Sequence, residues 1–505
     1  MTSLLVIAAL SVGICAAVMP FARRLAVCLG LVDRPDGQRK MQTRPIPLAG
    51  GITVLLSVCG ALGAVLPLAD TTPTRTADGT FLAGLLAAAV VICGVGVVDD
   101  LRGLRGRHKL LGQLAAVGIV LASGVLVRNI RLFGWDIDLG MLAVPFTVFW
   151  LLGAINSLNL IDGMDGLLTC VGIIVSLALA GMALCGGQWL TACVAVALAG
   201  SLAGFLPYNF PPASCFLGDS GSMLIGLVVG VLAIHGSLKG PATVALLAPA
   251  CVLTIPILDT GAAIVRRKLT GGSIFMTDRA HLHHCLLRRG LSSRRSLLYV
   301  SLFCLLTGVG ALGSVAFRSE IPAAFTALAV AGILITTRLF GYTEFVLVRK
   351  CLLTFLLSLW EKPARGRTNH LEIRLQGSAD WNELWERLTW EAFELNFKTI
   401  CLDMNVQAIQ EVYHAHWDRF DDQTEESDLW RVELPVVAGG HAVGRLQVTG
   451  PREGTSDVAR TLALAKMVED FTSNLWPLAA SQGNPSAPRK VAVPLPLVQV
   501  MGPPV

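Results

Sequence analysis

Charged side chains are scarce in this sequence. Asp, Glu, Lys and Arg make up 15% of its 505 residues, against roughly 25% in typical soluble domains. Glutamate is nearly absent from residues 1–338, which contain only Glu320. With 53% hydrophobic residues and a mean hydropathy of +0.64, the composition excludes a wholly water-soluble protein and a disordered chain. The 13 Cys lie scattered in apolar runs, which excludes a disulfide scaffold.

Apolar runs take the place of the missing charge. A run of about 20 apolar residues crosses a bilayer as one helix, and such runs recur up to about residue 338. The first run is not a cleavable signal, because Arg23 and Arg24 follow it instead of preceding it. We therefore expect an all-α polytopic membrane protein with about 11 transmembrane helices, near residues 3–22, 49–68, 80–98, 110–127, 140–157, 167–184, 189–207, 219–238, 243–265, 296–316 and 321–338.

Basic residues indicate how these helices are oriented. The connections after odd-numbered helices contain 18 Lys and Arg, and those after even-numbered helices contain 5. Because basic loops stay on the cytoplasmic side, we expect the N-terminus outside. An odd number of helices then leaves the C-terminus in the cytoplasm. The composition predicts a multi-pass protein of the plasma (inner) membrane, with the lipid bilayer and not nucleic acid as its surroundings.

The chain changes character after about residue 340. Residues 361–434 carry 16 carboxylates against 8 Lys and Arg. The pattern there predicts a small cytoplasmic α+β domain at residues 366–476, with strands 371–375, 399–404, 430–437 and 441–449 and helices near 380–396 and 456–474. This domain follows a membrane catalytic domain (1–340) and an interfacial helix or linker (341–365), and it precedes a Pro-rich disordered tail (477–505).

The predicted C-terminal domain contains no catalytic constellation. Trp381, Trp385 and Trp390 are spaced as core residues of one helix face. Because the domain is acidic and has no recognisable motif, we interpret it as a regulatory module or a docking site for a cytoplasmic partner.

The acidic residues of the membrane domain gather on the expected cytoplasmic side. Asp99 and Asp100 end the third apolar run. Two adjacent carboxylates repel each other unless a cation lies nearby, so the pair indicates a metal site or a general base. The alternative is a solvated helix end balanced by Arg102, Arg105 and Lys109.

The segment from Asn156 to Leu167 gives a stronger signal. Asn156, Asn159 and Asp162 recur at three-residue spacing and share a face if the helix continues. Asp165 follows, and the intervening glycines allow the backbone to turn and to approach a ligand closely. The alternative is a turn between two helices, but a turn requires fewer polar residues than this segment has.

Two further motifs carry groups suited to phosphate and metal. Asp219 lies between glycines where the eighth helix is expected to begin, and a carboxylate there suits Mg²⁺. An N-cap by Asp219 or Ser220 is the alternative. His281, His283 and His284 follow Arg279, and we interpret this cluster as binding phosphate or sugar. The alternatives are a zinc site, which has no paired Cys here, and a basic segment attracted to anionic lipid.

The remaining candidates are less specific. Arg39 and Lys40 lie in a loop broken by Pro and Gly, between the first two helices. This loop is interpreted as an anion-binding loop or as an ordinary basic cytoplasmic loop. Asp259, inside the ninth run, is either a carboxylate paired with a nearby base or a buried carboxylate with only a structural role.

Taken together and in their order along the chain, the five motifs resemble the polyprenyl-phosphate N-acetylhexosamine-1-phosphate transferases, glycosyltransferase family 4. The resemblance covers about residues 30–340, and the RAHLHH segment is similar to that of the GlcNAc-1-phosphate branch. It implies transfer of a HexNAc-1-phosphate, GlcNAc-1-phosphate being expected, from a UDP-sugar to undecaprenyl or another polyprenyl phosphate. UMP would be released, and Mg²⁺ would be required, with Mn²⁺ as a substitute. That reaction opens cell-envelope pathways such as lipopolysaccharide or exopolysaccharide biosynthesis.

The resemblance also implies roles for the motif residues. Asp219 and Asp100 would hold the metal, and catalysis would involve Asp99, Asp100, Asp162 and Asp165. Substrate contacts would come from Asn156, Asn159, Arg279, His281, His283, His284, Arg39 and Lys40. In the first loop the sequence departs from the family pattern, with Gln42 and Leu48 in place of a His and an Arg.

Other functions remain open from the sequence. An ion-coupled secondary transporter also has buried carboxylates in Gly-broken helices, but its sites lie near the midplane, whereas these residues lie at helix ends. A membrane-anchored sensor gives no reason for five polar motifs on one face. A homodimer is compatible with the sequence.

Overall fold

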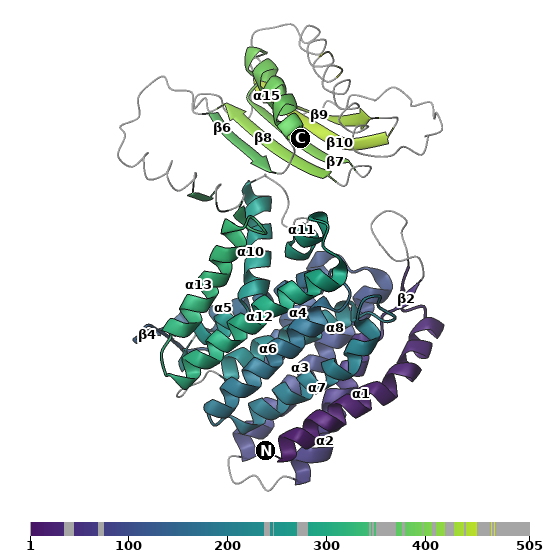
Figure 1. Cartoon of the computed structure of the whole chain (residues 1–505), viewed down its shortest axis with the longest axis vertical. Coiled ribbons are helices and arrows are strands. Elements are labelled where there is room, and N and C mark those ends of the chain that lie inside the picture. The colour runs from purple at the N-terminus through teal and green to yellow at the C-terminus, as the bar shows by residue number, and fades with distance from the viewer. Residues whose placement is uncertain are drawn as a thin grey trace. The chain divides into compact units, whose positions relative to one another are not determined.

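The computed structural model describes most of the membrane domain and the core of the C-terminal domain. The described residues are 2–34, 45–68, 75–236, 243–245, 247–269, 281–342, 345, 348–349, 370–375, 379–395, 397–406, 411–419, 429–438, 441–451, 466 and 469. The chain divides into two compact units, residues 1–263 with 280–342 and residues 264–279 with 343–505. Figure 1 labels their elements, and each unit is described by itself.

Helices form the first unit, which we call the membrane unit. They are α1 (Thr2–Cys28), α2 (Gly50–Val65), α3 (Arg75–Arg102), α4 (Gly106–Ala122), α5 (Ala143–Ile161), α6 (Leu167–Cys185), α7 (Trp189–Asn209), α8 (Gly218–His235), α9 (Leu247–Val252), α10 (Thr254–Leu269), α11 (Leu282–Arg288), α12 (Ser293–Ala316) and α13 (Ile321–Thr336). Of helix α10, only the residues up to Ala263 belong to this unit. Seven of the helices are long and apolar enough to cross a membrane, within α1, α3, α5 to α8 and α12. The chain is thus a polytopic membrane protein, while the total of 11 spans stays a prediction.

One predicted span is wrong in its interior. Residues 243–265 were expected to form a single helix, but they comprise strand β5 (Thr243–Ala245), then α9, and then α10 from Thr254. Pro256 explains the break between the two helices, because it has no N–H to donate to the carbonyl of Val252. The new helix starts just before this proline, where a missing N–H costs nothing.

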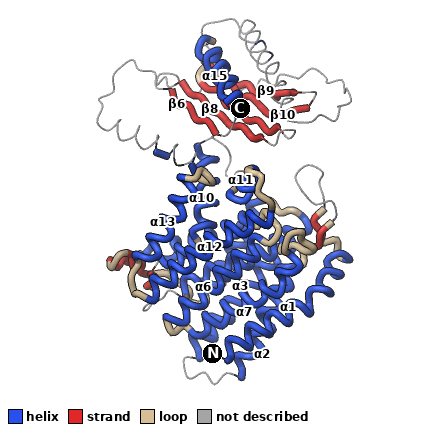
Figure 2. Tube along the Cα trace, in the orientation of Figure 1, coloured by secondary structure: helices blue, strands red, loops and turns tan. Residues whose placement is uncertain are grey.

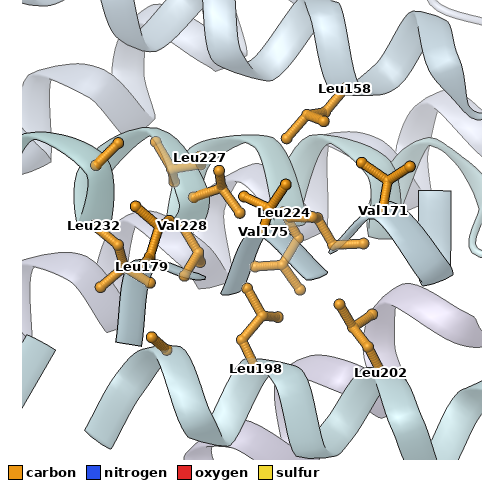
Figure 3. Close-up of a cluster of buried hydrophobic side chains, with 14 of the residues drawn as sticks. Leu158, Val171, Val175, Leu179, Leu198, Leu202, Leu224, Leu227, Val228 and Leu232 are labelled. Atoms are coloured by element: carbon orange, nitrogen blue, oxygen red, sulfur yellow. The ribbon is translucent and has the colours of Figure 1, made fainter. Parts of the chain in front are cut away.

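Helix α8 lies at the centre of the membrane unit and is almost completely buried. It packs against α2, α3 and α5, while α6 packs against α7 and α12. Figure 3 shows how leucines and valines of α5 to α8 interlock, among them Leu158, Val175, Leu198 and Leu224. A side chain at Gly96 would overlap the backbone of Ser220. The glycine therefore lets α3 approach α8 closely enough to place the end of α3 beside the start of α8.

Short strands connect the helices at both ends of this unit. Strands β1 (Val32–Asp33) and β2 (Ile46–Pro47) pair antiparallel. Strands β3 (Asn129–Leu132) and β4 (Trp135–Asp138) form a hairpin, and β5 pairs parallel with β3. The prediction of an all-α membrane domain did not include these strands. Each of them is too short for a periodic sequence pattern to reveal it.

The second unit contains a five-stranded antiparallel sheet with the order β6-β8-β7-β10-β9. Its elements are β6 (His370–Leu375), α15 (Ala379–Glu394), β7 (Thr399–Val406), β8 (Glu411–Arg419), β9 (Leu429–Ala438) and β10 (His441–Pro451). Figure 2 shows α15 against one face of the sheet. Trp385 and Leu388 of α15 pack there with Ile400, Trp417 and Leu446.

Two details of the C-terminal prediction need correction. Strand β8 was missed, since its residues EVYHAHWDR mix charged and aromatic side chains. Trp390 is not a core residue, because 65% of it is exposed. The helix predicted at 456–474 lies outside the described residues except for Lys466 and Glu469, which are helical. The linker 341–365 lies almost wholly outside them, and the tail lies outside them entirely.

Candidate active site

Four helix ends meet at one end of the membrane unit. Helices α3 and α5 finish there, and α4 and α8 begin there. They bring together five carboxylates that we call the carboxylate cluster: Asp99, Asp100, Asp162, Asp165 and Asp219. Residues separated by more than 100 positions touch within it. The convergence of the DD, NSLNLIDGMDGL and FLGDSG motifs, expected from the sequence, is present in the structure.

Lys109, in the first turn of α4, is the cation that pairs with this cluster among the described residues. Its Nζ lies 3.0 Å from Asp99 Oδ2 and 2.9 Å from Asp219 Oδ1. Asn159 reinforces the arrangement, since its Nδ2 donates to Asp219 Oδ1 at 2.5 Å and to Ser222 Oγ at 2.7 Å. Lys109 therefore links α4 to both α3 and α8. The sequence analysis gave Lys109 only the role of balancing a helix end.

Asp100 binds the backbone at the start of α8. Its Oδ1 accepts a hydrogen bond from the N–H of Asp219 at 2.8 Å, and its Oδ2 accepts one from the N–H of Ser220 at 3.1 Å. Gly218 has φ +69°, and a Cβ there would lie 2.5 Å from Asp100 Oδ2. The alternative interpretation of this motif, an N-cap by Asp219 or Ser220, is thus wrong, because a carboxylate from another helix satisfies these amides. Asp100 fixes the position of Asp219.

Asn156 has partners inside the helix bundle. Its side-chain amide exchanges two hydrogen bonds with that of Gln113, at 3.0 and 3.2 Å, and also donates to Leu152 O at 2.8 Å. Gln113 lies one turn after Lys109 on α4. Asn156 therefore ties α5 to α4, a contact the sequence could have suggested from the four-residue spacing of Lys109 and Gln113.

The α5–α6 turn is held by its own set of hydrogen bonds. Helix α5 ends at Ile161, so Asp162 does not continue the helical face that the spacing suggested. Gly166 turns the chain with φ +74°, and its N–H donates to Asn209 Oδ1 at 3.1 Å. Asp165 accepts a hydrogen bond from Ala213 N at 2.9 Å. Asp165 thus secures the turn against the segment after α7.

Asp162 differs from its neighbours because it has no hydrogen-bond partner within the described part of the chain. Burial, followed by the negative charges of Asp219, Asp100 and Asp165, raises the pKa of Asp162 to about 8. Five carboxylates face one lysine here, and the negative charges around Asp162 favour its protonated form when no cation is bound.

The histidine cluster reaches the same turn from α11. His283 is buried, and neither of its ring nitrogens has a hydrogen-bond partner among the described residues. A Cβ at Gly163 would lie 2.5 Å from His283 Nε2, so this glycine makes room for the ring beside Asp162. Burial, followed by repulsion from His284 and His281, holds the pKa of His283 well below its ordinary value. Two unpartnered buried nitrogens are typical of a site that receives a polar ligand or water.

His281 has a carboxylate partner. Its Nδ1 lies 2.9 Å from Asp259 Oδ2, and both residues are buried. Asp259 thus has a nearby base as its partner, a contact that both interpretations of this residue allow. Three predicted substrate-binding residues, Arg39, Lys40 and Arg279, lie outside the described residues, and so does Gln42.

The chemistry of the cluster fits a divalent cation. No three His, Cys, Asp or Glu side chains in the described residues are arranged to enclose a metal ion by themselves. Magnesium, however, is usually held by one or two carboxylates together with waters and substrate phosphates. The unpartnered carboxylate of Asp162 and the surplus negative charge near Asp219 suit that form of binding.

Comparison with known proteins agrees with the motifs. Residues 82–237 match glycosyl transferase family 4. Over 297 residues the chain is 33% identical to the probable undecaprenyl-phosphate N-acetylglucosaminyl 1-phosphate transferase of Bacillus subtilis. The aligned region makes up 58% of this chain and 80% of the relative. The chain belongs to glycosyl transferase family 4. The resemblance inferred from the five motifs is thereby confirmed.

Other relatives of this family 4 protein carry similar names. It is 34% identical over 357 residues to the decaprenyl-phosphate N-acetylglucosaminephosphotransferase of Mycobacterium tuberculosis, covering 64% of this chain and 87% of the relative. It is 32% identical over 305 residues to the undecaprenyl-phosphate alpha-N-acetylglucosaminyl 1-phosphate transferase of Escherichia coli K12, covering 58% and 79%. The segment matched to the family, 82–237, contains the whole carboxylate cluster and Lys109.

Proposed function

We propose that this family 4 protein transfers GlcNAc-1-phosphate from UDP-GlcNAc to undecaprenyl or a related polyprenyl phosphate. An oxygen of the lipid phosphate attacks the β-phosphorus of the UDP-sugar, the bond to UMP breaks, and UMP leaves. The product is a polyprenyl-diphospho-sugar, the first membrane intermediate of a cell-envelope polysaccharide. The names of three relatives support the sugar and the lipid class.

The observation that carries the proposal is the meeting of Lys109, Asn159 and the carboxylate cluster at one end of the membrane unit. Phosphoryl transfer needs little covalent help from a protein, and its catalysis consists mainly of positioning and charge neutralisation. A lysine beside several carboxylates supplies charged groups for the positioning that this reaction requires. A polyprenyl phosphate also requires a site at a membrane boundary, which is where helix ends lie.

The residues of the cluster divide the work in this proposal. Asp219 and Asp162 would hold Mg²⁺, or Mn²⁺ in its place, and the ion would supply positive charge against the diphosphate. Asp100 fixes the start of α8 and thereby the position of Asp219. Asp99, held by Lys109, takes up the proton of the lipid phosphate. His281, His283 and His284, with Arg279, contact the diphosphate or the sugar.

The membrane orientation is part of the same proposal. The connections after the odd-numbered predicted spans contain the excess of Lys and Arg. This excess favours a plasma-membrane protein with this site on the cytoplasmic face, where UDP-sugars are made. An ion-coupled transporter is less well supported, because its polar residues would gather halfway along the helices and those described here lie at helix ends.

The decisive experiment follows UMP release from purified protein in detergent. The assay contains undecaprenyl phosphate, Mg²⁺ and one of several UDP-sugars. We expect release with UDP-GlcNAc and loss of release in Asp219→Ala. Asp136→Asn is the matched control, since it alters an exposed carboxylate paired with Arg131 in the β3–β4 hairpin, away from the cluster. Absence of release with every donor, from wild-type protein shown to be folded, would contradict the proposal.

A further inference from the structure

Asp259 makes two hydrogen bonds to one short stretch of chain. Its Oδ2 lies 2.9 Å from His281 Nδ1, and its Oδ1 accepts a hydrogen bond from the N–H of Leu282 at 2.7 Å. Asp259 is 1% exposed and His281 is 5% exposed. The carboxylate lies on α10, and its partners begin α11. Both of its oxygens are thus used to hold the start of the helix that carries the histidines.

A buried carboxylate in a membrane protein needs a reason. Removing a carboxylate and an imidazole from water costs several kcal/mol, and a buried ion pair is often no more stabilising than well-packed apolar side chains. Packing alone therefore does not explain why this pair is present. A defined orientation of the imidazole ring does, because a ring held at Nδ1 has only one direction left for Nε2.

The bond to Asp259 also determines which ring nitrogen carries a proton. A carboxylate accepts, so Nδ1 of His281 carries the proton, and in the neutral ring Nε2 is then free of one. Nε2 makes no hydrogen bond within the described residues. The ring stacks parallel to that of His283, with the centroids 6.1 Å apart. His283 in turn lies against Gly163, next to Asp162. A series of neighbours therefore leads from His281 through His283 and Gly163 to Asp162 of the carboxylate cluster.

We propose that Asp259 is a positioning residue for the transferase reaction: it fixes the ring of His281 so that Nε2 is presented to the phosphate or sugar groups of the substrate. This inference rests on the function proposed above. Asp259 lies outside the matched family segment 82–237, and it acts through His281 and the first turn of α11 instead of touching substrate.

The test compares Asp259→Asn with His281→Ala and with the double variant in the UMP-release assay. Asparagine keeps a carbonyl oxygen for Leu282 N, but its NH₂ group faces Nδ1 and forces the other tautomer on the ring. We expect kcat/KM to fall about 10- to 100-fold, the range seen when a partner that orients a functional histidine is removed. The same kinetic parameter, kcat or KM, should change as in His281→Ala.

The double variant separates positioning from a structural role. If Asp259 acts through His281, adding Asp259→Asn to His281→Ala lowers kcat/KM by no more than about twofold further, the scatter expected of additive effects. A full additional loss would overturn the inference, and so would wild-type activity of Asp259→Asn. If wild-type protein itself releases no UMP, the proposed function fails instead. Asp136→Asn again serves as the control for loss of a carboxylate.

A second variant keeps the test valid if Asp259→Asn does not fold. His281→Asn places an amide near the position of Nδ1 and so retains the bond to Asp259, but it has no atom at the position of Nε2. We expect a folded protein, judged by its midpoint temperature in detergent, with activity as low as that of His281→Ala. Wild-type activity in His281→Asn would mean that the bond to Asp259 serves folding alone, and would overturn the inference.

Discussion

At the scale of single residues, the site depends on Lys109 as much as on the carboxylates. The sequence analysis named all five acids of the cluster, because Asp is rare in the membrane domain and each one stands out. It did not single out Lys109, because basic residues are common at helix ends and a lysine beside two acids is ordinary there. What distinguishes Lys109 is its second carboxylate partner, Asp219, which lies 110 positions away and is not evident from local spacing.

Replacement of Lys109 by Met should abolish most of the activity. It removes the charge that holds Asp99 and Asp219 in place and leaves the two carboxylates to repel each other. We expect UMP release to fall roughly 10²- to 10³-fold, as when a group that stabilises transition-state charge is lost. Arg131→Met, which breaks an exposed ion pair in the β3–β4 hairpin, is the control. Activity of Lys109→Met within about twofold of wild type would show that the ion pairs are incidental.

At Asp162 we expect a substitution to raise the stability of the protein and to abolish its activity. Asp162 is half-buried and has no hydrogen-bond partner among the described residues, and its raised pKa indicates that the folded protein disfavours the charge. Without Mg²⁺, Asp162→Asn should therefore raise the midpoint temperature of unfolding at pH 8, through a gain of about 0.5–2 kcal/mol, while UMP release is lost. A lower midpoint would mean that the carboxylate has a stabilising partner.

At the scale of elements, the apolar runs predicted nearly every long helix, since burial in a bilayer requires such runs. They could not predict where proline interrupts one, as between α9 and α10, nor the short strands between helices. They also could not show that Asp100 binds the first turn of α8 or that Asn156 pairs with Gln113. Those contacts depend on how closely helices approach, and the approach depends on small residues such as Gly96.

Gly96 and Gly94 allow that dependence to be tested within one helix. A Cβ at Gly96 would overlap the Ser220 backbone, whereas a Cβ at Gly94 would meet nothing within 4 Å. Gly96→Ala should destabilise the protein by about 1–3 kcal/mol and lower activity, because it moves Asp100 away from α8. Gly94→Ala should be neutral or stabilising by up to about 1 kcal/mol. Thermal unfolding in detergent and UMP release measure both effects, and equal behaviour of the two variants would contradict this explanation.

At the scale of the whole molecule, the described site lies within one of the two units. The described contacts of the carboxylate cluster and of the Asp259–His281 pair all lie in the membrane unit. The C-terminal unit has a core and a sheet of its own. The sequence predicted an α+β domain there from its change in composition, but an acidic composition does not identify a partner.

Deletion of residues 365–505 should therefore leave UMP release by purified protein within about twofold of wild type. In cells, we expect polysaccharide output to change, because the deleted unit is proposed to receive a regulatory partner. Output and activity that are both unchanged would exclude a regulatory role. Loss of activity in purified, folded protein would instead show that the C-terminal unit contributes to the site.

The bond between Asp100 and the start of α8 has a consequence for biosynthesis. The two partners are 119 positions apart, so α3 enters the membrane well before the amides it will satisfy have been translated. Until α8 arrives beside it, Asp219 has neither its final position nor its lysine. A partly inserted chain therefore lacks the assembled carboxylate cluster, and the proposed transfer becomes possible only after the bundle is assembled.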